Sequence, residues 1–318
     1  MNMTELAKRA GVSKTAVSFA LNNKPGISQD TRNHILRIAE ELNYIPKLKT
    51  HKDTIIFSIV TNDHSQSLDY FQNLPFFQSV IEAFKSKSYL KGYNLTLQTI
   101  STINDTVIDE WQRPNVYGVV VLGTFLNEHD IAAINQVTLQ KLVVLDNNSG
   151  LITHHTVGIN NRLGMQQIYH QLDTTQSILL LTGMPTIQNF LERSETFHSL
   201  ARNDALSLTE LSLNGFEIEP SSQQEVDSIL THLNTPTIVV AENDYLAMKV
   251  ANVAHANDLT ENLIALYGFD NISTKGLSPI DIQSIIVDIP TMVDVAIDVI
   301  LKDLPTALHV VVDTKLKE

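Results

Sequence analysis

The sequence contains no cysteine and a single tryptophan, and none of its apolar runs approaches the length of a membrane span. Without cysteine the chain has no disulfide framework, no thiolate metal ligand and no thiol nucleophile. A helix that crosses a bilayer needs about 20 predominantly apolar residues, so no membrane contact is expected. These absences point away from disulfide-rich secreted scaffolds, thiol enzymes and integral membrane proteins.

The first nine residues lack the apolar stretch of a secretory signal and reach a basic pair at Lys8 and Arg9. A secretory signal places such basic residues before an apolar segment of about 7–15 residues. The sequence therefore predicts a cytoplasmic protein.

Positive and negative charges are unevenly distributed along the chain. The formal net charge is -13, yet residues 1–50 carry eight Lys or Arg against four Asp or Glu, while the remainder carries 14 against 31. A basic head on an acidic body lets phosphate attraction act locally while the body discourages nonspecific adhesion to DNA. On charge alone, an ordinary solvated helical surface is the favoured alternative.

The N-terminal region, residues 1–46, reads as three short helices with apolar stripes. Gly11 is placed to end the first helix in a left-handed conformation, and Ser13 and Ser28 are placed to cap the second and third. Pro46 follows the last stripe. Three such stripes can close a small all-α core.

From residue 55 onward, short β-rich runs alternate with amphipathic helices, which is typical of parallel sheets built from βαβ units. The expected strands are Ile55–Val60, Leu95–Thr99, Val116–Leu122, Leu142–Leu145, Ser177–Leu181, Thr237–Val240, Leu263–Tyr267 and Ser284–Val287. The expected helices are Phe77–Tyr89, Arg162–Leu172, Asn189–Arg202, Ser222–Leu233, Asp244–Asn257 and Thr291–Leu301. Two doubly wound units fit this stretch, which predicts an α/β class with two lobes over residues 55–318.

No catalytic constellation competes with a binding function. The chain has no Gly-x-Ser-x-Gly, no Gly-x-x-x-x-Gly-Lys and no His-Glu-x-x-His. His154 and His155 are adjacent rather than at helical ligand spacing, so we expect exposed loop residues and no metal site. The sequence predicts neither enzymatic activity nor a cofactor.

The segment 3–18 has the layout of a helix-turn-helix, with a glycine turn and a capped second helix. That helix would enter the major groove of double-stranded DNA and present its first-turn side chains to base edges. Lys14, Thr15 and Phe19 are the candidates for base contact. The other candidate DNA-binding residues are Thr4, Ser13, Ser18, Asn22, Ser28 and Thr31. A generic small helical bundle is nearly as good a reading of the periodicity alone.

A longer ordered set of residues resembles the DNA-binding head of the lactose/galactose-repressor family (LacI/GalR) of bacterial transcription regulators. The resemblance is carried by Gly11–Ser18, Leu21–Ser28, Thr31-Arg32 and Ala39–Pro46. It spans nearly all of residues 3–46 and implies a homodimer that binds a near-palindromic operator, one head per half-site.

Two departures from this resemblance concern DNA contact. Most family members carry arginine where this chain has Phe19, which could touch a thymine methyl or pack within the head. Only residues 47–54 separate Pro46 from the first strand, which is short for the family's hinge helix. Leu48 could act as a reduced minor-groove wedge, although a flexible basic tether is slightly favoured.

The body resembles the family's periplasmic-binding-protein-like core over residues 55–316. The landmarks include Val116–Val121, Val144–Asp146, Asn160–Gly164, Ala241–Asp244 and Tyr267–Asp270. The resemblance implies that an effector binds between the lobes. The candidate effector-binding residues are Thr61, Phe76, Phe77, Asp146, Arg193, Asn243 and Asp270.

The chemistry of these residues suits a sugar. Asp146 and Asp270 can accept paired hydrogen bonds from vicinal hydroxyls, and Arg193 offers a fixed fork of donors. The alternatives are that Asp270 only forms a turn, Asn243 only caps a helix and Phe77 only fills the core. Glu195-Thr196-Phe197 also departs from the family pattern after Arg193, which puts the aim of Arg193 in question.

The sequence therefore predicts a repressor whose operator affinity is changed by a sugar or sugar-derived effector. A regulator of the same fold that answers to a protein partner, or to no ligand, is the alternative.

Overall fold

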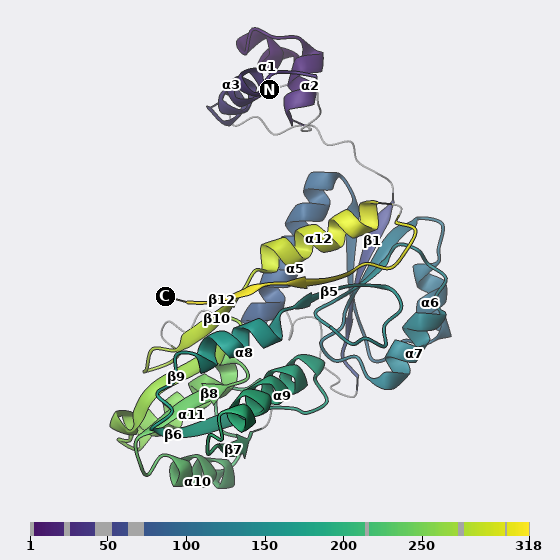
Figure 1. Ribbon diagram of the computed structural model, residues 1–318. Helices are drawn as coiled ribbons and strands as arrows, with labels where there is room; N and C mark the ends of the chain where they lie inside the picture. Colours follow the sequence, from purple (N-terminus) through teal and green to yellow (C-terminus); the bar gives the residue numbers. More distant parts are fainter. Residues whose placement is uncertain are drawn as a thin grey trace. The chain divides into compact units, whose positions relative to one another are not determined.

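The computed structural model describes residues 3–21, 26–41, 53–62, 73–213, 216–272, 277–302 and 304–317 (Figure 1). Residue contacts divide the chain into a helical unit within residues 1–51, called the head, and a larger α/β unit after residue 51, called the body. Thr54, expected in the linker, is the first residue of β1. The remaining predicted linker, Leu48 included, lies outside the described residues except Asp53.

The head contains α1 (Met3–Arg9), α2 (Lys14–Leu21) and α3 (Gln29–Glu41). Leu6, Val17 and Ile35, one from each helix, are fully buried and form the centre of its core. Gly11 has a φ of +65° after α1, which is the left-handed conformation expected where a helix ends at glycine. The all-α character predicted for the head is thereby confirmed.

The N-terminal lobe of the body is built on a six-stranded sheet of order β11-β5-β4-β3-β1-β2, in which all pairings are parallel. Its strands are β1 (Thr54–Val60), β2 (Asn94–Ile100), β3 (Val116–Leu122), β4 (Leu142–Leu145), β5 (His155–Ile159) and β11 (His309–Val312). Its helices are α5 (Pro75–Lys91), α6 (Asp105–Trp111), α7 (Glu128–Gln136) and α12 (Ile289–Leu301). Helices on both faces explain why β1 and β4 are almost continuously apolar and buried.

The C-terminal lobe has a second six-stranded sheet of order β12-β10-β9-β8-β6-β7, parallel except for the antiparallel pair β10 and β12. Its strands are β6 (Ser177–Thr182), β7 (Thr209–Ser212), β8 (Thr237–Ala241), β9 (Leu263–Phe269), β10 (Gln283–Val287) and β12 (Thr314–Leu316). Its helices are α8 (Asn161–Tyr169), α9 (Gln188–Asn203), α10 (Gln223–His232), α11 (Asp244–Ala256) and a 3₁₀ turn at Thr260–Asn262. The predicted two-lobed α/β body is confirmed.

The chain passes between the lobes three times (Figure 1). It crosses after β5, again after β10, and finally between β11 and β12, where only Asp313 separates a strand of one sheet from a strand of the other. The lobes are therefore joined by three connections rather than one.

One sequence prediction fails in the body. His155, expected in an exposed loop, is the buried first residue of β5, and its Nδ1 accepts a hydrogen bond from the Leu308 amide at 2.9 Å. Burial lowers the pKa of His155, so the neutral ring that accepts this bond is favoured. The described residues contain no group of three His, Cys, Asp or Glu side chains arranged to hold a metal ion.

Helices of the described chain all fall short of the length and apolarity that crossing a membrane requires.

Candidate functional site

A small cavity lies between the lobes and brings five of the seven predicted effector residues together. They are Phe76, Phe77, Asp146, Arg193 and Asp270. Sequence reasoning missed the other lining residues, which are Thr124, Ile187, Asn189, Phe190, Phe216 and Tyr245. Apart from Arg193 and Phe216, the lining residues follow strands or lie at the starts of helices, where open α/β sheets place ligands.

The two carboxylates follow parallel strands and share an unusual backbone conformation. Asp146 comes directly after β4 with a φ of +64°, and Asp270 comes directly after β9 with a φ of +95°. Non-glycine residues rarely adopt positive φ, and such residues concentrate at functional sites. The left-handed turn at each strand end aims both side chains into the cavity lining.

Arg193 of α9 is buried, with 2% of its surface exposed, and its three nitrogen positions all have protein partners. Nε donates to Asn161 Oδ1 at 2.9 Å and Nη1 donates to the Glu242 carbonyl at 2.6 Å. Nη2 forms an ion pair with Asp270 Oδ1 at 3.2 Å. The guanidinium also lies 3.6 Å from the centre of the Phe269 ring. These contacts fix the orientation of the Arg193 side chain, although Glu195-Thr196-Phe197 departs from the family pattern.

Asp146 is held between the lobes by two donors. Thr124 Oγ1, in its own lobe, donates to Oδ2, and Asn189 Nδ2 of α9 donates to Oδ1 at 2.8 Å. Burial raises the pKa of Asp146 to about 7, although Thr124, Arg193 and Asn189 favour its ionised form. Burial also raises the pKa of Asp270, against the opposing charge of Arg193.

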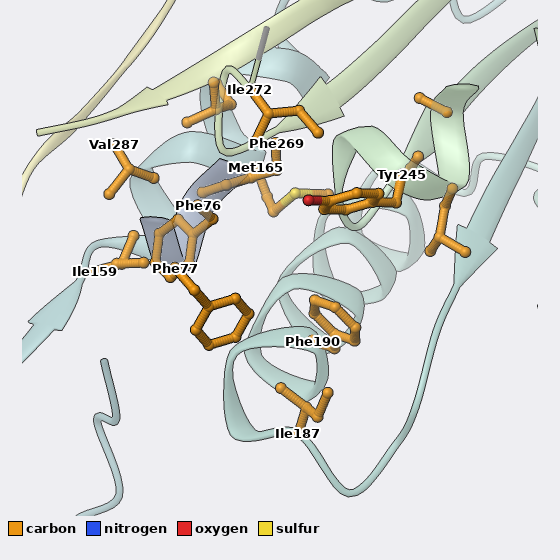
Figure 2. Packing of buried hydrophobic residues seen from close by; sticks show 14 of the residues in the cluster. Phe76, Phe77, Ile159, Met165, Ile187, Phe190, Tyr245, Phe269, Ile272 and Val287 are labelled. Atoms are coloured by element: carbon orange, nitrogen blue, oxygen red, sulfur yellow. The ribbon is translucent and has the colours of Figure 1, made fainter. Parts of the chain in front are cut away.

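Aromatic rings from both lobes fill most of the space between these polar groups. Phe216 is central to them, with ring centres 6.3 Å from Phe77, 5.8 Å from Phe125, 5.7 Å from Phe190 and 5.9 Å from Tyr245. Figure 2 shows three of these partners, Phe77, Phe190 and Tyr245, in the same buried cluster. The remaining cavity is only about 20 Å³, which is space for about one water molecule.

The other two predicted effector residues do not line this cavity. Thr61 is buried after β1, and its hydroxyl donates to the Ile100 carbonyl at 3.3 Å. Asn243 caps α11 through a hydrogen bond from the Leu246 amide to Oδ1, at 2.9 Å. Its Nδ2 is buried without a partner among the described residues. Asn243 therefore occupies a helix-capping position, as in the alternative interpretation.

A second hydrogen-bonded contact joins the lobes beside the cavity. Asn148, in the loop after β4, donates from Nδ2 to Glu192 Oε2 of α9 at 3.0 Å. Asn161 Nδ2 donates to the same oxygen at 2.8 Å and to Asn189 Oδ1 at 2.9 Å. Asn148, Asn161 and Glu192 also line an open groove of about 860 Å³, called the outer groove. Arg162, His198 and Arg202 are among its lining residues.

In the head, the residues expected to contact bases begin α2. Lys14 and Thr15 are exposed in the first turn of that helix. Phe19 is half-buried, and its ring packs so closely on Gly26 that a side chain there would collide with it. The position of Phe19 thus fits the packing alternative, although its part in DNA contact stays a prediction.

The other candidate DNA-binding residues occupy three kinds of position. Ser13 Oγ accepts from the Ala16 amide and Ser28 Oγ accepts from the Thr31 amide, both at 3.1 Å, so both serines cap helices. Thr4 and Ser18 lie in α1 and α2. Asn22 lies outside the described residues.

Residues 2–47 match the family described as bacterial regulatory proteins, lacI family. Over 285 residues the chain is 27% identical to a probable HTH-type transcriptional repressor, ExuR, of Bacillus subtilis (strain 168), covering 86% of this chain and 82% of the relative. It is 25% identical over 284 residues to the repressor PurR of Pasteurella multocida (strain Pm70), covering 84% and 81%. The head therefore matches the lacI family, and the similarity to repressors extends over most of the chain.

Solved structures of transcriptional regulators share the fold. A Lac repressor bound to ONPG in its repressed state superposes with a TM-score of 0.68 at 17% identity, and a CelR-cellobiose complex with a TM-score of 0.64 at 16% identity. Both matches cover 100% of this chain and 98% of the solved chain. The chain is a DNA-binding transcriptional repressor, as its sequence predicts, and the relatives that it matches are repressors rather than enzymes.

Proposed function

We propose that this repressor binds its operator as a homodimer and that a sugar or sugar derivative, bound between the lobes, changes its affinity for DNA. The observation that carries the proposal is the convergence of Asp146, Arg193 and Asp270 with aromatic rings from both lobes. Carboxylates accept hydrogen bonds from sugar hydroxyls, and aromatic rings cover the apolar faces of sugar rings. The relatives described as bound to cellobiose and to ONPG support this assignment.

The filled cavity supplies the coupling between effector and DNA. Small-molecule sites have volumes of about 300–1,000 Å³, whereas the free space beside Phe216 is about 20 Å³. An effector therefore enters only when Phe216 moves or the lobes separate, so effector binding and rearrangement of the body are one event. A ligand with unequal affinity for the two arrangements shifts the balance between them.

The DNA half of the proposal assigns base contact to Lys14 and Thr15 at the exposed start of α2. Ser13 and Ser28 cap helices, and an exposed cap presents backbone amides to a phosphate. Lys14→Ala is expected to weaken specific binding and reduce its dependence on salt, because one cation fewer displaces counterions.

The same filled cavity favours a second candidate, a repressor of this fold that answers to a protein partner or to no ligand. Because Phe216 already packs where an effector ring would lie, the closed arrangement of the body needs no ligand to satisfy its lining.

An electrophoretic mobility shift on DNA upstream of the protein's own gene distinguishes the candidates. The assay includes a panel of sugars and sugar phosphates and is repeated at two salt concentrations. A specific, salt-sensitive shift that one compound changes is the expected result. A shift that no compound changes supports the second candidate, and the absence of any specific shift contradicts both.

A further inference from the structure

One basic side chain of the head is buried. Arg32, near the start of α3, has only 9% of its surface exposed. The other Lys and Arg side chains that the structure describes in the head are all exposed, namely Lys8, Arg9, Lys14 and Arg37. An exposed cation attracts DNA by displacing counterions from the phosphates. Arg32 lies inside the head, so its charge acts on other groups.

The guanidinium of Arg32 binds the C-terminal end of α2. Its Nη1 donates to the Phe19 carbonyl at 2.9 Å and to the Ala20 carbonyl at 3.3 Å. The last four carbonyls of a helix have no partner within the helix and carry a partial negative charge, so a cation stabilises them. The last turn of α2 contains no basic residue of its own. Arg32 therefore supplies, from α3, the cation that α2 lacks.

Further contacts hold the two helices at this junction. The Arg32 amide donates to the Ser28 carbonyl at 3.0 Å, and Ser28 Oγ caps α3. The Phe19 ring packs on Gly26, so the last turn of α2 is held through a ring as well as through its carbonyls. The hydrogen bonds of a helix make its eight residues one rod. Holding the last turn of α2 therefore sets the direction of its first turn.

From these contacts we propose that Arg32 is a positioning residue for sequence recognition. It fixes the last turn of α2, so that Lys14 and Thr15 in the first turn meet the bases in one orientation. The proposal rests on the proposed function of the head, in which α2 reads DNA. Arg32 thus contributes to the preference for the operator over other sequences, and it makes no phosphate contact of its own.

Competition binding with the full-length protein measures this preference. The probe is a duplex that the unaltered protein selects from a pool of random sequence, and the reference is a scrambled duplex of the same length and composition. Arg32→Met removes the guanidinium and keeps an apolar stem inside the head. Arg37→Met is the matched control, because it removes an exposed cation from the same helix. The affinity of each protein for both duplexes is measured at several salt concentrations.

Arg32→Met is expected to weaken binding to the selected duplex about tenfold and binding to the scrambled duplex less than about twofold. The salt dependence of binding to the scrambled duplex should stay unchanged, because a buried cation displaces no counterions. Arg37→Met should leave the ratio of the two affinities as it is. An unchanged ratio in Arg32→Met overturns the proposal. A weaker salt dependence in Arg32→Met overturns it too, since that result would assign Arg32 to phosphate contact.

Hydrogen exchange separates positioning from a general loss of folding, which would lower binding to both duplexes in proportion. In Arg32→Met, faster exchange is expected in α2, while α1 and the rest of α3 stay protected. If Arg32→Met unfolds the head, Arg32→Lys decides. The lysine ammonium keeps the charge but ends one bond short of the position of Nη1, so the preference should fall in a folded head. An unchanged preference in Arg32→Lys would then contradict the positioning role.

The unaltered protein separates the two levels of the proposal. If it selects no sequence from the random pool, the proposed function of the head fails, and the positioning role of Arg32 fails with it. If it selects a sequence and the Arg32 variants keep the same preference, only the role of Arg32 is overturned.

Discussion

Asn189 Nδ2 lies 2.8 Å from Asp146 Oδ1, and this hydrogen bond joins α9 of the C-terminal lobe to the end of β4 in the N-terminal lobe. The same nitrogen lies 3.2 Å from the Asp146 carbonyl oxygen. Any rearrangement that separates the lobes must break this contact, so the pair reports directly on closure.

Removing the amide is expected to weaken the closed body. Asn189→Ala takes a donor from buried Asp146 and an acceptor from Asn161, so we expect the free energy of unfolding to fall by about 1–3 kcal/mol. Asn203→Ala, at the exposed end of the same helix, is the matched control and is expected to change it by less than about 0.5 kcal/mol. Urea denaturation measures both, and equal values would contradict the role of Asn189.

Stability is expected to decrease as pH rises from about 4 to about 7. Burial raises the pKa of Asp146, Glu242 and Asp244 to about 7, from ordinary values of 3.8 and 4.5. Between these limits the folded state binds more protons than the unfolded state, so raising the pH favours unfolding, and the effect levels off above pH 7. Melting temperatures between pH 4.5 and 8 measure the decrease.

Asp146→Asn removes one of these three carboxyl groups and should make the decrease of stability with rising pH shallower. Asp298→Asn, at an exposed carboxylate of α12, should leave the slope as it is. If stability instead rises steadily over this range, the raised pKa values are wrong.

Phe216→Ala should open the cavity between the lobes. The ring packs against four other aromatic rings, so its loss is expected to lower the free energy of unfolding by about 1–4 kcal/mol, with the partial exposure of Phe216 moderating the cost. An effector would then enter without displacing the ring. Titration with a compound that changes the mobility shift is expected to show a higher affinity than for the unaltered protein, and a lower affinity would indicate that Phe216 stacks on the ligand instead.

Two glycines of the head form a matched pair for a DNA-binding test. A methyl group on Gly26 would lie 2.8 Å from the Phe19 ring, whereas a methyl group on Gly11 would meet nothing within 4 Å. Both residues have positive φ, so each alanine variant carries a backbone cost of about 1 kcal/mol, and Gly26→Ala adds a collision. Affinity for the operator should fall further in Gly26→Ala than in Gly11→Ala. Equal losses would indicate that the Phe19 ring moves aside at little cost.

Sequence periodicity predicted most of the strongly apolar elements and missed several short or polar ones. Val116–Leu122 is the strand β3 as expected, and the helix expected at Phe77–Tyr89 runs from Pro75 to Lys91. The strand β7 escaped prediction because Thr209–Ser212 is largely exposed and polar. The strand β5 was not predicted because the polar residues His155 and Thr156 begin a segment that is nevertheless fully buried.

The candidate site was only partly visible in the sequence. Asp146 and Asp270 directly follow predicted strands, so the rule for ligand sites in open sheets finds them. Phe216 follows no predicted strand and belongs to no motif, and only its ring contacts show its place in the cleft. The partners of Arg193 are also far from it in the sequence, since Asn161, Glu242 and Asp270 are 32, 49 and 77 residues away.

The final crossing between β11 and β12 has a consequence for how the protein is made. β11 completes the edge of the N-terminal lobe beside β5, yet its residues 309–312 follow five strands of the C-terminal lobe in the chain. Until they leave the ribosome, β5 has an open edge in a sheet that is otherwise ready to form, and exposed strand edges invite pairing with other chains. The N-terminal lobe can thus reach its native arrangement only after most of the C-terminal lobe has been synthesised, and until then β5 has a vulnerable edge.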